Sequence, residues 1–488
     1  MKLSKLLHNF TDQPLTKDPE ISGLQLDSRK VEPGNLFIAY PGETQDGRMH
    51  IAQAIRQGAA AVVQETGDIT HSAIPIINIE DCRSKVGHIA KRYFDAPSQK
   101  LKVVGVTGTN GKTSCTHLIA QALNYCQNKA AVMGTLGVGF LDSLNNTGLT
   151  TPDAIAVQRG LADIVKAGGQ AVAMEVSSHS LVQNRVNGVD FDVAVFTNLT
   201  RDHLDYHDTL EAYGAAKRKL FEQPGLRHAV INADDHFGQR LIRDFESSLS
   251  VVAYGLSKPH AKQAVYVENP HFSSDGVEAK IITPWGSGFI KYQCIGDFNL
   301  SNLLVVISTL GSMGLPFNDL LALSPRLSGV PGRMEFVGGG DRPLGIVDYA
   351  HTPDALENVL RTARQNTKGK LICVFGCGGD RDRGKRPMMA KVSERYADLV
   401  VVTSDNPRTE DPESILRNIC EGFSKNAPMM KVSDRAKAIQ YAVNSAERGD
   451  VIVVAGKGHE NMQIINNKKL PFDDRLELRK VLDLYPSP

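Results

Sequence analysis

The sequence has no long apolar segment and no excess of charge of either sign. No uninterrupted apolar stretch approaches the ~20 residues of a membrane-spanning helix, and the first nine residues lack the apolar run of a signal peptide. We therefore expect no membrane span and a cytoplasmic location. Because 55 basic residues face 54 acidic ones, no global field attracts nucleic acid, and we expect no nucleic-acid partner.

Cysteine is also scarce, with seven residues scattered through a chain of 488. Cys373 and Cys377 have neither a second cysteine pair nor histidines at the spacing of a metal site. This pattern favours buried, reduced thiols over a zinc centre.

The length of the chain predicts three domains, at roughly 150 residues each. Two segments mark the boundaries: 92–98 (RYFDAPS), with proline and small polar residues, and 328–335 (SGVPGRME), with glycine and proline. We predict domains at 1–98, 99–330 and 331–488. Short strand-like runs in the first predict a small α/β domain.

The segment 101–114, LKVVGVTGTNGKTS, is the most informative stretch. A valine-rich strand breaks into a glycine-containing turn and then a helix, an arrangement in which amide N–H groups face a polyphosphate. Lys112 would reach its outer oxygens, and the Thr113 hydroxyl would bind Mg²⁺. The longer G-x-x-x-x-G-K-[ST] pattern fails at Val106, so only the shorter G-x-x-G-K-T from Gly108 is present. We predict nucleotide binding over the alternative, an ordinary strand-turn-helix connection.

Two further strands of the central domain end in residues that bind metals. Residues 170–175 predict a strand that ends in Glu175, and residues 191–203 predict one that ends in His203. Ligands of open parallel sheets bind beyond the carboxyl ends of the strands, so we expect Thr113, Glu175 and His203 to converge on one or two Mg²⁺ ions. Each residue alone is typical of a surface group, and their occurrence beside a phosphate loop favours the metal.

Residues 150–153, TTPD, predict a helix start with Thr151 as the N-cap and Pro152 in the first helical position. The threonine pair leaves one hydroxyl for an anionic ligand at that helix N-terminus, although capping alone also accounts for it.

Lys217 lies on the apolar face of a helix predicted within residues 208–221. The residues alone favour a lysine whose stem covers apolar neighbours while its ammonium group reaches water. Beyond it, alternating residues from 265 to 295 predict a small antiparallel addition to the central domain.

Four strands of the third domain end in polar loops, which predicts a doubly wound sheet with a ligand crevice at one edge. The segments are 345–351, 371–386, 398–411 and 451–460. The glycine-rich loop after residue 375 has the wrong spacing for a dinucleotide fingerprint, so an NAD site is not expected. The fold class is α/β: a small N-terminal domain, a central parallel-sheet ATPase domain with a phosphate loop, and a Rossmann-like C-terminal domain.

Five motifs together resemble those of the ATP-dependent Mur ligases of peptidoglycan synthesis. They are GTNGKT (108–113), EVSSH (175–179), NLTRDHLD (198–205), DYAHTPD (348–354) and GKGHE (456–460). The resemblance spans all three predicted domains. A further motif, DNPR at 405–408, resembles the signature of the members that add meso-2,6-diaminopimelate, whereas the lysine-adding members lack arginine there.

The resemblance implies roles for individual residues. For ATP it implies Gly108, Thr109, Asn110, Gly111, Lys112, Thr113, Ser114, Asn299, Arg333 and Asp348. For the UDP-muramoyl-dipeptide it implies Leu26, Ser28, Thr44, Gln45, Thr150, Thr151, Ser177, Gln183 and Arg185. For diaminopimelate it implies Arg381, Asp405, Asn406, Pro407, Arg408, Gly456 and Glu460. It also implies that Lys217 is a carbamate that ligates Mg²⁺ with Thr113, Glu175 and His203, and that Lys112, Lys217 and His203 are catalytic.

The implied reaction is an ATP-dependent amide ligation through an acyl phosphate. It would add meso-2,6-diaminopimelate to the D-glutamate of UDP-N-acetylmuramoyl-L-Ala-D-Glu, and we expect a monomer. The alternatives are a lysine-adding Mur ligase, a folylpolyglutamate synthetase, and a nucleotide-gated binding module without ligase activity. The loop of Arg408 and the N-terminal domain argue against the first two, and the polar strand ends of both larger domains argue against the third.

Overall fold

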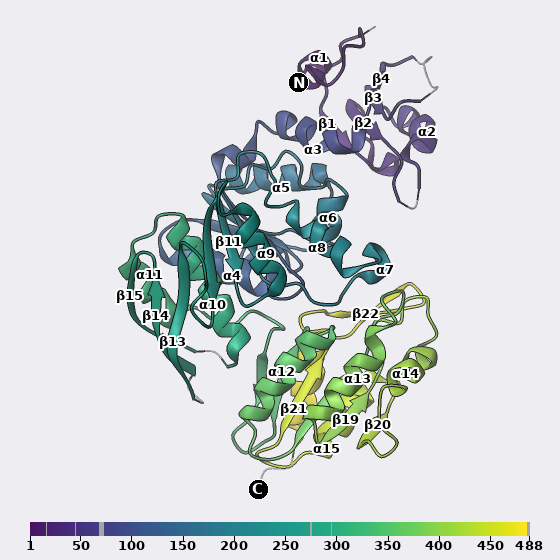
Figure 1. Ribbon diagram of the computed structural model, residues 1–488. Helices are drawn as coiled ribbons and strands as arrows, with labels where there is room; N and C mark the ends of the chain where they lie inside the picture. The colour runs from purple at the N-terminus through teal and green to yellow at the C-terminus, as the bar shows by residue number, and fades with distance from the viewer. Residues whose placement is uncertain (16, 44, 68–72, 274–275, 294, 486–488) are drawn as a thin grey trace. The chain divides into compact units, whose positions relative to one another are not determined.

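The computed structural model of the chain describes residues 1–488 except 16, 44, 68–72, 274–275, 294 and 486–488. Figure 1 labels its helices and strands, and the chain divides into two compact units. Unit 1 comprises Met1–Thr107, Leu123–Ala194 and Ala216–His228, and unit 2 comprises Gly108–Ala122, Val195–Ala215 and Ala229–Pro488. Within the described residues, every helix is too short or too polar to cross a membrane. The predicted domain division at 1–98, 99–330 and 331–488 stays a prediction.

The first sheet of unit 1 is parallel, in the order β1-β2-β3-β4. Its strands are β1 (Gly23–Gln25), β2 (Asn35–Ala39), β3 (Ala61–Gln64) and β4 (Ile76–Asn78). From β2, Leu36 and Ile38 pack with α1 (Leu3–Leu7) and α3 (Cys82–Tyr93), whereas Phe37 and Ala39 pack with α2 (Ile51–Arg56). Both faces of this sheet are therefore covered, and every residue of β2 is buried.

Unit 1 also contains the strand that leads to the phosphate loop. The order here is β5-β9-β6-β7-β8, of which the first three strands are parallel and the rest antiparallel. The strands are β5 (Lys102–Thr107), β9 (Ala171–Glu175), β6 (Ala130–Gly134), β7 (Gly137–Phe140) and β8 (Ser143–Asn145), with helices α5 (Ala154–Lys166) and α6 (Ser178–Val182). Strand β10 (Val193–Phe196) runs from unit 1 into unit 2, and α8 (Leu210–Arg218) runs back.

The predicted start of α5 was wrong. Asp153, not Thr151, is the N-cap, and its carboxylate accepts hydrogen bonds from the backbone N–H groups of Ile155 (3.0 Å) and Ala156 (2.9 Å). One carboxylate thus satisfies two of the unpaired N–H groups of the first turn. The Thr151 hydroxyl instead donates to the carbonyl of Glu175 at 2.8 Å.

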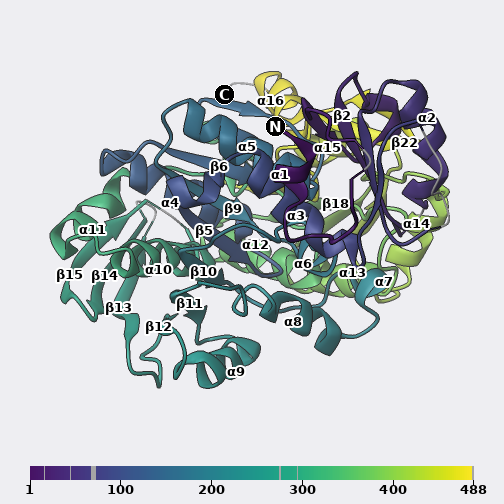
Figure 2. The same cartoon turned by 90° about the horizontal axis from the view of Figure 1, so that it is seen from above.

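The first part of unit 2 has the strand order β11-β12-β13-β14-β15. The strands are β11 (His228–Asn232), β12 (Ser250–Gly255), β13 (Ala264–Ser273), β14 (Gly276–Thr283) and β15 (Gly286–Tyr292). Because β13, β14 and β15 pair antiparallel, the predicted antiparallel addition is confirmed. Helix α10 (Asp297–Ser312) contacts β12 and β13, and α11 (Phe317–Leu323) contacts β15 (Figure 2). The other helices here are α4 (Lys112–Tyr125), which begins in unit 2, α7 (Leu204–His207) and α9 (His236–Phe245).

The second part of unit 2 is a six-stranded sheet in the order β16-β17-β21-β18-β19-β20, parallel except for β16. The strands are β16 (Glu335–Gly338), β17 (Leu344–Asp348), β21 (Val451–Ala455), β18 (Leu371–Phe375), β19 (Leu399–Val402) and β20 (Met429–Lys431). One face packs against α12 (Pro353–Gln365), α13 (Lys385–Tyr396) and α14 (Pro412–Cys420), and the other against α15 (Arg435–Asn444) and α16 (Asp474–Asp483). A hairpin, β22 (Met462–Ile465) and β23 (Lys468–Pro471), precedes α16. The α/β class and the doubly wound C-terminal sheet are confirmed.

Candidate active site

The predicted phosphate loop lies between β5 and α4. Gly108 has φ +150°, and a Cβ there would meet Thr197 Oγ1 at 1.8 Å, so only glycine fits. Lys112 is the first residue of α4, and its Nζ donates to the carbonyls of Gly108 and Thr109, both at 2.8 Å. The N–H group of Asn110 donates to Asn198 Oδ1 at 2.8 Å. The loop is therefore a tight turn that opens a helix, as the sequence predicts.

The residues predicted for ATP in unit 2 lie together around this loop. Arg333 Nη2 donates to Thr113 Oγ1 at 3.0 Å, and the Arg333 guanidinium lies 4.5 Å from the ring centre of Tyr349. Asp348 accepts hydrogen bonds from two backbone N–H groups at 2.7 Å, and burial raises its pKa. A cavity of about 110 Å³ is lined by these groups. Its lining includes Asn110, Gly111, Ser114, Asn299, Arg333 and Asp348.

A buried carboxylate beside the predicted His203 was missed by sequence reasoning. Asp202 Oδ2 lies 3.4 Å from His203 Nε2 and 3.5 Å from His351 Nε2, and its Oδ1 lies 3.5 Å from Lys385 Nζ. Burial opposes the charge of Asp202, but Lys385 and the two histidines hold its pKa well below the usual value. Both Asp202 and His351 stand inside the motifs that carried the family resemblance, and that position was the only signal for them in the sequence.

The prediction that a strand ends in His203 was wrong. Strand β10 ends at Phe196, and His203 lies at the N-cap of α7 with φ +54°. A polar loop therefore connects the end of β10 to His203. This loop is bonded to the phosphate loop, because the Thr109 N–H donates to the Asn198 carbonyl and the Thr200 N–H donates to Thr109 Oγ1.

The residues predicted for diaminopimelate lie on three loops of unit 2, residues 376–386, 404–411 and 456–460, which we call the C-terminal rim. Arg408 is half-buried with φ +54°, and its Nη1 donates to the Gly379 carbonyl at 2.7 Å. Burial, and then the charge of Arg381, lower the pKa of Arg408. A Cβ at Gly378 would meet Arg408 Nη1 at 2.7 Å, and one at Gly379 would meet the Pro407 carbonyl oxygen at 2.0 Å. Two of the three loops are therefore in close contact.

The third loop of the rim is joined to the second by a buried lysine that was not predicted. Lys457 Nζ donates to Glu460 Oε2 at 2.8 Å and to Asn406 Oδ1 at 3.2 Å. Asn406 Nδ2 donates to the same Glu460 oxygen at 2.8 Å. Gly456 has φ +117°, and a Cβ there would meet Asp405 Oδ2 at 2.6 Å. Asp405, Asn406, Gly456 and Glu460 are thus brought together, while Arg381 is exposed nearby.

In unit 1, five of the residues predicted for the UDP-muramoyl-dipeptide form one polar cluster. Arg185 Nη1 donates to the Thr151 carbonyl at 2.9 Å, and its Nη2 bonds Gln183 Oε1. The Ser177 N–H donates to Thr151 Oγ1 at 3.1 Å, and Thr150 Oγ1 accepts from the Thr135 hydroxyl at 3.1 Å.

The loop that follows β2 is bonded to this cluster through Glu43, a residue that was not predicted. Gln183 Nε2 donates to Glu43 Oε1 at 2.8 Å. Ser28 is buried and donates to Gln53 Oε1 at 3.0 Å, Leu26 is half-buried, and Gln45 is exposed. The predicted Thr44 lies outside the described residues.

The predicted metal ligands are divided between the units. Glu175 ends β9, as predicted, is 1% exposed, and accepts hydrogen bonds from the N–H (2.8 Å) and hydroxyl (3.2 Å) groups of Thr135. Lys217 is 1% exposed, so the interpretation of a lysine whose ammonium group reaches water was wrong. Thr113 and His203 belong to unit 2, and the convergence of the four stays a prediction. No cluster of three or more His, Cys, Asp or Glu with metal-site geometry occurs among the described residues.

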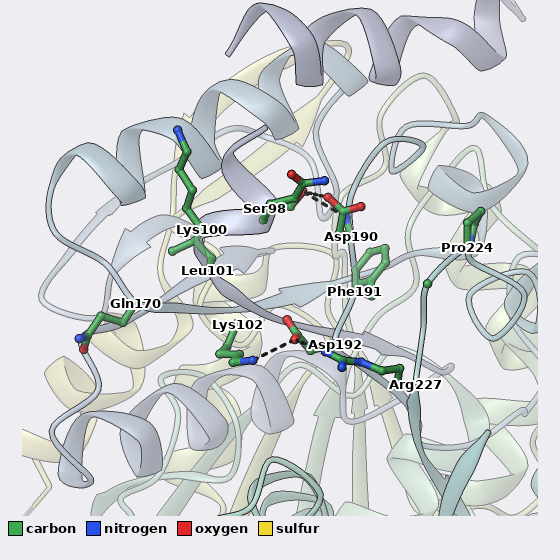
Figure 3. Close-up of a pocket in the computed structure, with 12 residues that line it drawn as sticks. Ser98, Lys100, Leu101, Lys102, Gln170, Asp190, Phe191, Asp192, Pro224 and Arg227 are labelled. Atoms are coloured by element: carbon green, nitrogen blue, oxygen red, sulfur yellow. Dashed lines mark hydrogen bonds and ion pairs between the residues drawn. The ribbon is translucent and has the colours of Figure 1, made fainter. Parts of the chain in front are cut away.

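A cavity of about 530 Å³ lies at the amino end of β5, opposite to the phosphate loop (Figure 3). Two of its cations lie near one carboxylate, since Lys102 Nζ and Arg227 Nη2 are 3.4 and 4.0 Å from Asp192 Oδ1, and Ser98 Oγ donates to Asp190 Oδ2 at 2.7 Å. Since ligands of open parallel sheets bind at the carboxyl ends of the strands, we place no substrate there.

Three family models match the chain: "Mur ligase family, catalytic domain" over residues 20–93, "Mur ligase middle domain" over 106–310, and "Mur ligase, glutamate ligase domain" over 332–458. The chain is 49% identical to the UDP-N-acetylmuramoyl-L-alanyl-D-glutamate--2,6-diaminopimelate ligase of Pseudomonas putida, over 100% of this chain and 99% of that one. It is 48% identical to the ligase of the same name from Coxiella burnetii, over 98% and 99% of the two chains. A solved structure of a ligase of this name is 38% identical, with a TM-score of 0.71 and 99% coverage of both chains. The chain belongs to the Mur ligase family.

Proposed function

We propose that the chain is an ATP-dependent ligase that joins meso-2,6-diaminopimelate to the D-glutamate of UDP-N-acetylmuramoyl-L-Ala-D-Glu. The observation that carries this proposal is the 49% identity to the Pseudomonas putida ligase over the whole chain. The half-buried Arg408 on the C-terminal rim supports diaminopimelate as the amino acid.

ATP would occupy the phosphate loop of unit 2. The N–H groups at the start of α4 would face the phosphates, and Lys112 would exchange its carbonyl partners for the outer phosphate oxygens. Arg333 lies against both Thr113 and Tyr349, so it is held beside the loop. The cavity lined by Asn299 and Asp348 would receive the remainder of the nucleotide.

The UDP-muramoyl-dipeptide would bind in unit 1. The cluster of Thr151, Ser177, Gln183 and Arg185 supplies hydroxyl, amide and guanidinium donors suited to the carboxylates of a dipeptide. The UDP group would lie near Leu26, Ser28 and the loop of Gln45, and Glu43 connects that sheet to Gln183.

Diaminopimelate would bind at the C-terminal rim. It differs from lysine by a second carboxylate, and the planar guanidinium of Arg408 grips a carboxylate with two parallel hydrogen bonds. Glu460 would accept from an ammonium group. Asn406 Oδ1 already accepts from Lys457 and from the Ile464 N–H, so Asn406 acts chiefly by holding Glu460 in place.

The reaction then follows from charge. A γ-carboxylate oxygen of D-glutamate attacks the γ-phosphorus of ATP, and the bond from that phosphorus to the oxygen that bridges the β- and γ-phosphates breaks. The products of this step are an acyl phosphate and ADP. An amino group of diaminopimelate attacks the acyl carbon, and the tetrahedral intermediate loses phosphate as the nitrogen loses its proton. Lys112 offsets the charge that keeps the two anions apart.

The family uses Mg²⁺, and we propose that Thr113, Glu175, His203 and carbamylated Lys217 hold it. Glu175 fits this role because it is a carboxylate at the carboxyl end of β9, and carboxylate oxygens are the ligands that Mg²⁺ takes from proteins. Lys217 is 1% exposed, and a carbamate on its side chain would supply an anion to Mg²⁺. When bound, Mg²⁺ offsets phosphate charge.

The carbamate is tested with Lys217→Ala. We expect the variant to lose most of its activity and to regain part of it in excess of a small carboxylate, which supplies the missing anion. Full activity of Lys217→Ala without additives would exclude the carbamate.

The function itself is tested by a mass-resolved product assay that offers the UDP-muramoyl-dipeptide, ATP-Mg²⁺ and either diaminopimelate or L-lysine. We expect a diaminopimelate product and ADP release only when both cosubstrates are present. A lysine product would identify a lysine-adding ligase, and nucleotide binding without product would identify a binding module.

We also propose that the chain acts as a monomer in the cytoplasm. The described cysteines are free thiols, which supports a reducing compartment. Cell fractionation and sedimentation measure the two properties.

A further inference from the structure

A fully buried ion pair lies beneath the C-terminal rim. Arg435 is the first residue of α15 and Asp474 is the first residue of α16, and both side chains are 0% exposed. Arg435 Nε donates to Asp474 Oδ1 and Nη2 donates to Oδ2, both at 2.7 Å. The guanidinium is thereby fixed in one orientation by a bidentate pair.

The other hydrogen bonds of Arg435 reach two strand ends. Its Nη2 also donates to the carbonyl of Ala455, the last residue of β21, at 2.9 Å. Its Nη1 donates to the carbonyl of Ser404, just beyond the end of β19, at 3.3 Å. The residues that follow these carbonyls are Asp405 and Gly456. One guanidinium therefore bonds the first residue of one rim loop and the residue directly before another.

The charge of Arg435 also acts on the rim. Burial opposes this charge, but Asp474, Asp405 and Glu460 raise the pKa of Arg435 above its ordinary value. Arg435 is therefore a buried cation behind two of the carboxylates proposed to contact diaminopimelate.

Stability alone does not account for this pair. The free energy needed to remove two charges from water is about as large as the free energy gained from their attraction. A protein with apolar side chains of similar volume in place of a buried ion pair is therefore often as stable. A guanidinium that bonds two separate strand ends does what an apolar pair does not do, because it fixes the distance between them.

We propose that Arg435, oriented by Asp474, is a positioning residue for the amino-acid substrate, which sets the spacing between the loops 404–411 and 456–460. The identity of that substrate rests on the proposed function. A reacting group misplaced by about 1 Å loses on the order of 100-fold in rate. Small changes in this spacing should therefore affect the amino acid selectively.

The experiment compares Arg435→Met with the double variant Arg435→Met/Asp474→Leu. The matched control is Arg448→Met/Asp341→Leu, which removes an exposed ion pair of the same length, 2.7 Å, from unit 2. Tm and the KM values for diaminopimelate, ATP and the UDP-muramoyl-dipeptide are measured for each.

We expect Arg435→Met to lower Tm strongly, because Asp474 is left charged and unpaired, and the double variant to regain most of that loss. In the double variant KM for diaminopimelate should rise about tenfold or more, while KM for ATP stays within about twofold of the wild type. The control should change neither Tm nor any KM.

A folded double variant with an unchanged KM for diaminopimelate would overturn the proposal, as would an equal rise in all three KM values. If the double variant does not fold, Arg435→Lys decides by the same criterion, because it keeps the charge and lacks the planar fork. The series is repeated with L-lysine. A wild type that uses only L-lysine would refute the proposed substrate, whereas the KM for lysine would still test the positioning.

Discussion

The phosphate loop and the C-terminal rim both follow strand ends, but they are held in different ways. In the phosphate loop, Lys112 bonds the carbonyls of Gly108 and Thr109, residues within the same turn. In the rim, Asn406 bonds Glu460 and Lys457, which are 54 and 51 positions further along the chain. The lysine of the first site is therefore held by its chain neighbours, whereas the amide of the second is held by residues distant in sequence.

This difference separates two kinds of substitution. A change of Lys112 would remove a group that we propose to face the nucleotide, and we expect it to leave the surrounding turn in place. A change in the rim alters a hydrogen-bond network that joins several loops, so its effect extends to residues that remain. The following variants test this contrast.

The largest effect is expected for Lys112→Ala. The variant loses the cation that stabilises the transferring phosphoryl group, so ligation should fall below detection. The circular dichroism spectrum and Tm should remain near those of the wild type, because the glycine turn persists without the side chain. Turnover like that of the wild type would exclude the phosphate-loop assignment.

Arg408→Ala should have the next largest effect. Removing one partner of a buried charge pair costs about 2–5 kcal/mol, which is roughly a thirtyfold to several-thousandfold loss of kcat/KM for diaminopimelate. KM for ATP should hardly move. The control is Arg417→Ala, which changes an exposed arginine on α14 that is paired with Asp411 at 3.6 Å.

A loss of less than about twofold in Arg408→Ala, well under 1 kcal/mol, would contradict the assignment of the rim to diaminopimelate. Arg408→Lys refines the test, since it keeps the charge and loses the second parallel hydrogen bond.

Each site also contains a histidine whose pKa is lowered by burial and then by Arg333. The values are about 4 for His117 on α4 and about 3 for His459 in the rim. Above pH 6.5 both residues are neutral in the folded and in the unfolded chain. As the pH falls below this value, the unfolded chain takes up protons first. Stability should therefore fall by about 1.4 kcal/mol per pH unit for each histidine until its folded pKa is reached.

Tm of the wild type, His117→Asn and His459→Asn at pH 7, 6 and 5 measures this loss. Each variant should lose less Tm over this range than the wild type, whereas His8→Asn, at an exposed position, should lose the same amount. Equal slopes in all four proteins would show that neither histidine is buried in its neutral form.

The smallest effect is expected for Lys102→Ala, at the end of β5 opposite to the phosphate loop. Lys102 is 61% exposed and its pair with Asp192 is long, at 3.4 Å, so the free energy of unfolding should change by less than about 1 kcal/mol. All three KM values should stay the same. A changed KM for ATP would mean that the cavity of Figure 3 is coupled to nucleotide binding.

The contrast between the two sites also determines what the sequence could predict. The phosphate loop could be predicted because its glycines, lysine and threonine lie within one short stretch of sequence, residues 108–113. Arg435 and Asp474 gave no signal, since each is one charge at a helix start and 39 positions separate them.

Two further misses have local causes. Thr151 was taken as a cap because two capping residues stand two positions apart, and only the backbone conformation decides between Thr151 and Asp153. Asp202 was overlooked because its partners His351 and Lys385 come from segments far away in the sequence. Local patterns thus predicted the strands and the polar loops that follow them, but not the buried groups that support these loops.

The close approach of Gly378 and Gly379 to the loop of Arg408 has a consequence for combinatorial mutagenesis. At position 379 a side chain would strike backbone, the Pro407 carbonyl, so a randomised library should return glycine whatever stands at 408. At position 378 a side chain would strike only the Arg408 guanidinium, at 2.7 Å. Tolerance there should depend on the second position, with alanine or serine at 378 recovered in folded clones that carry a small residue at 408. The two neighbouring glycines would then differ in epistasis: Gly379 is constrained by backbone, whatever stands at 408, whereas Gly378 is constrained by the side chain at 408.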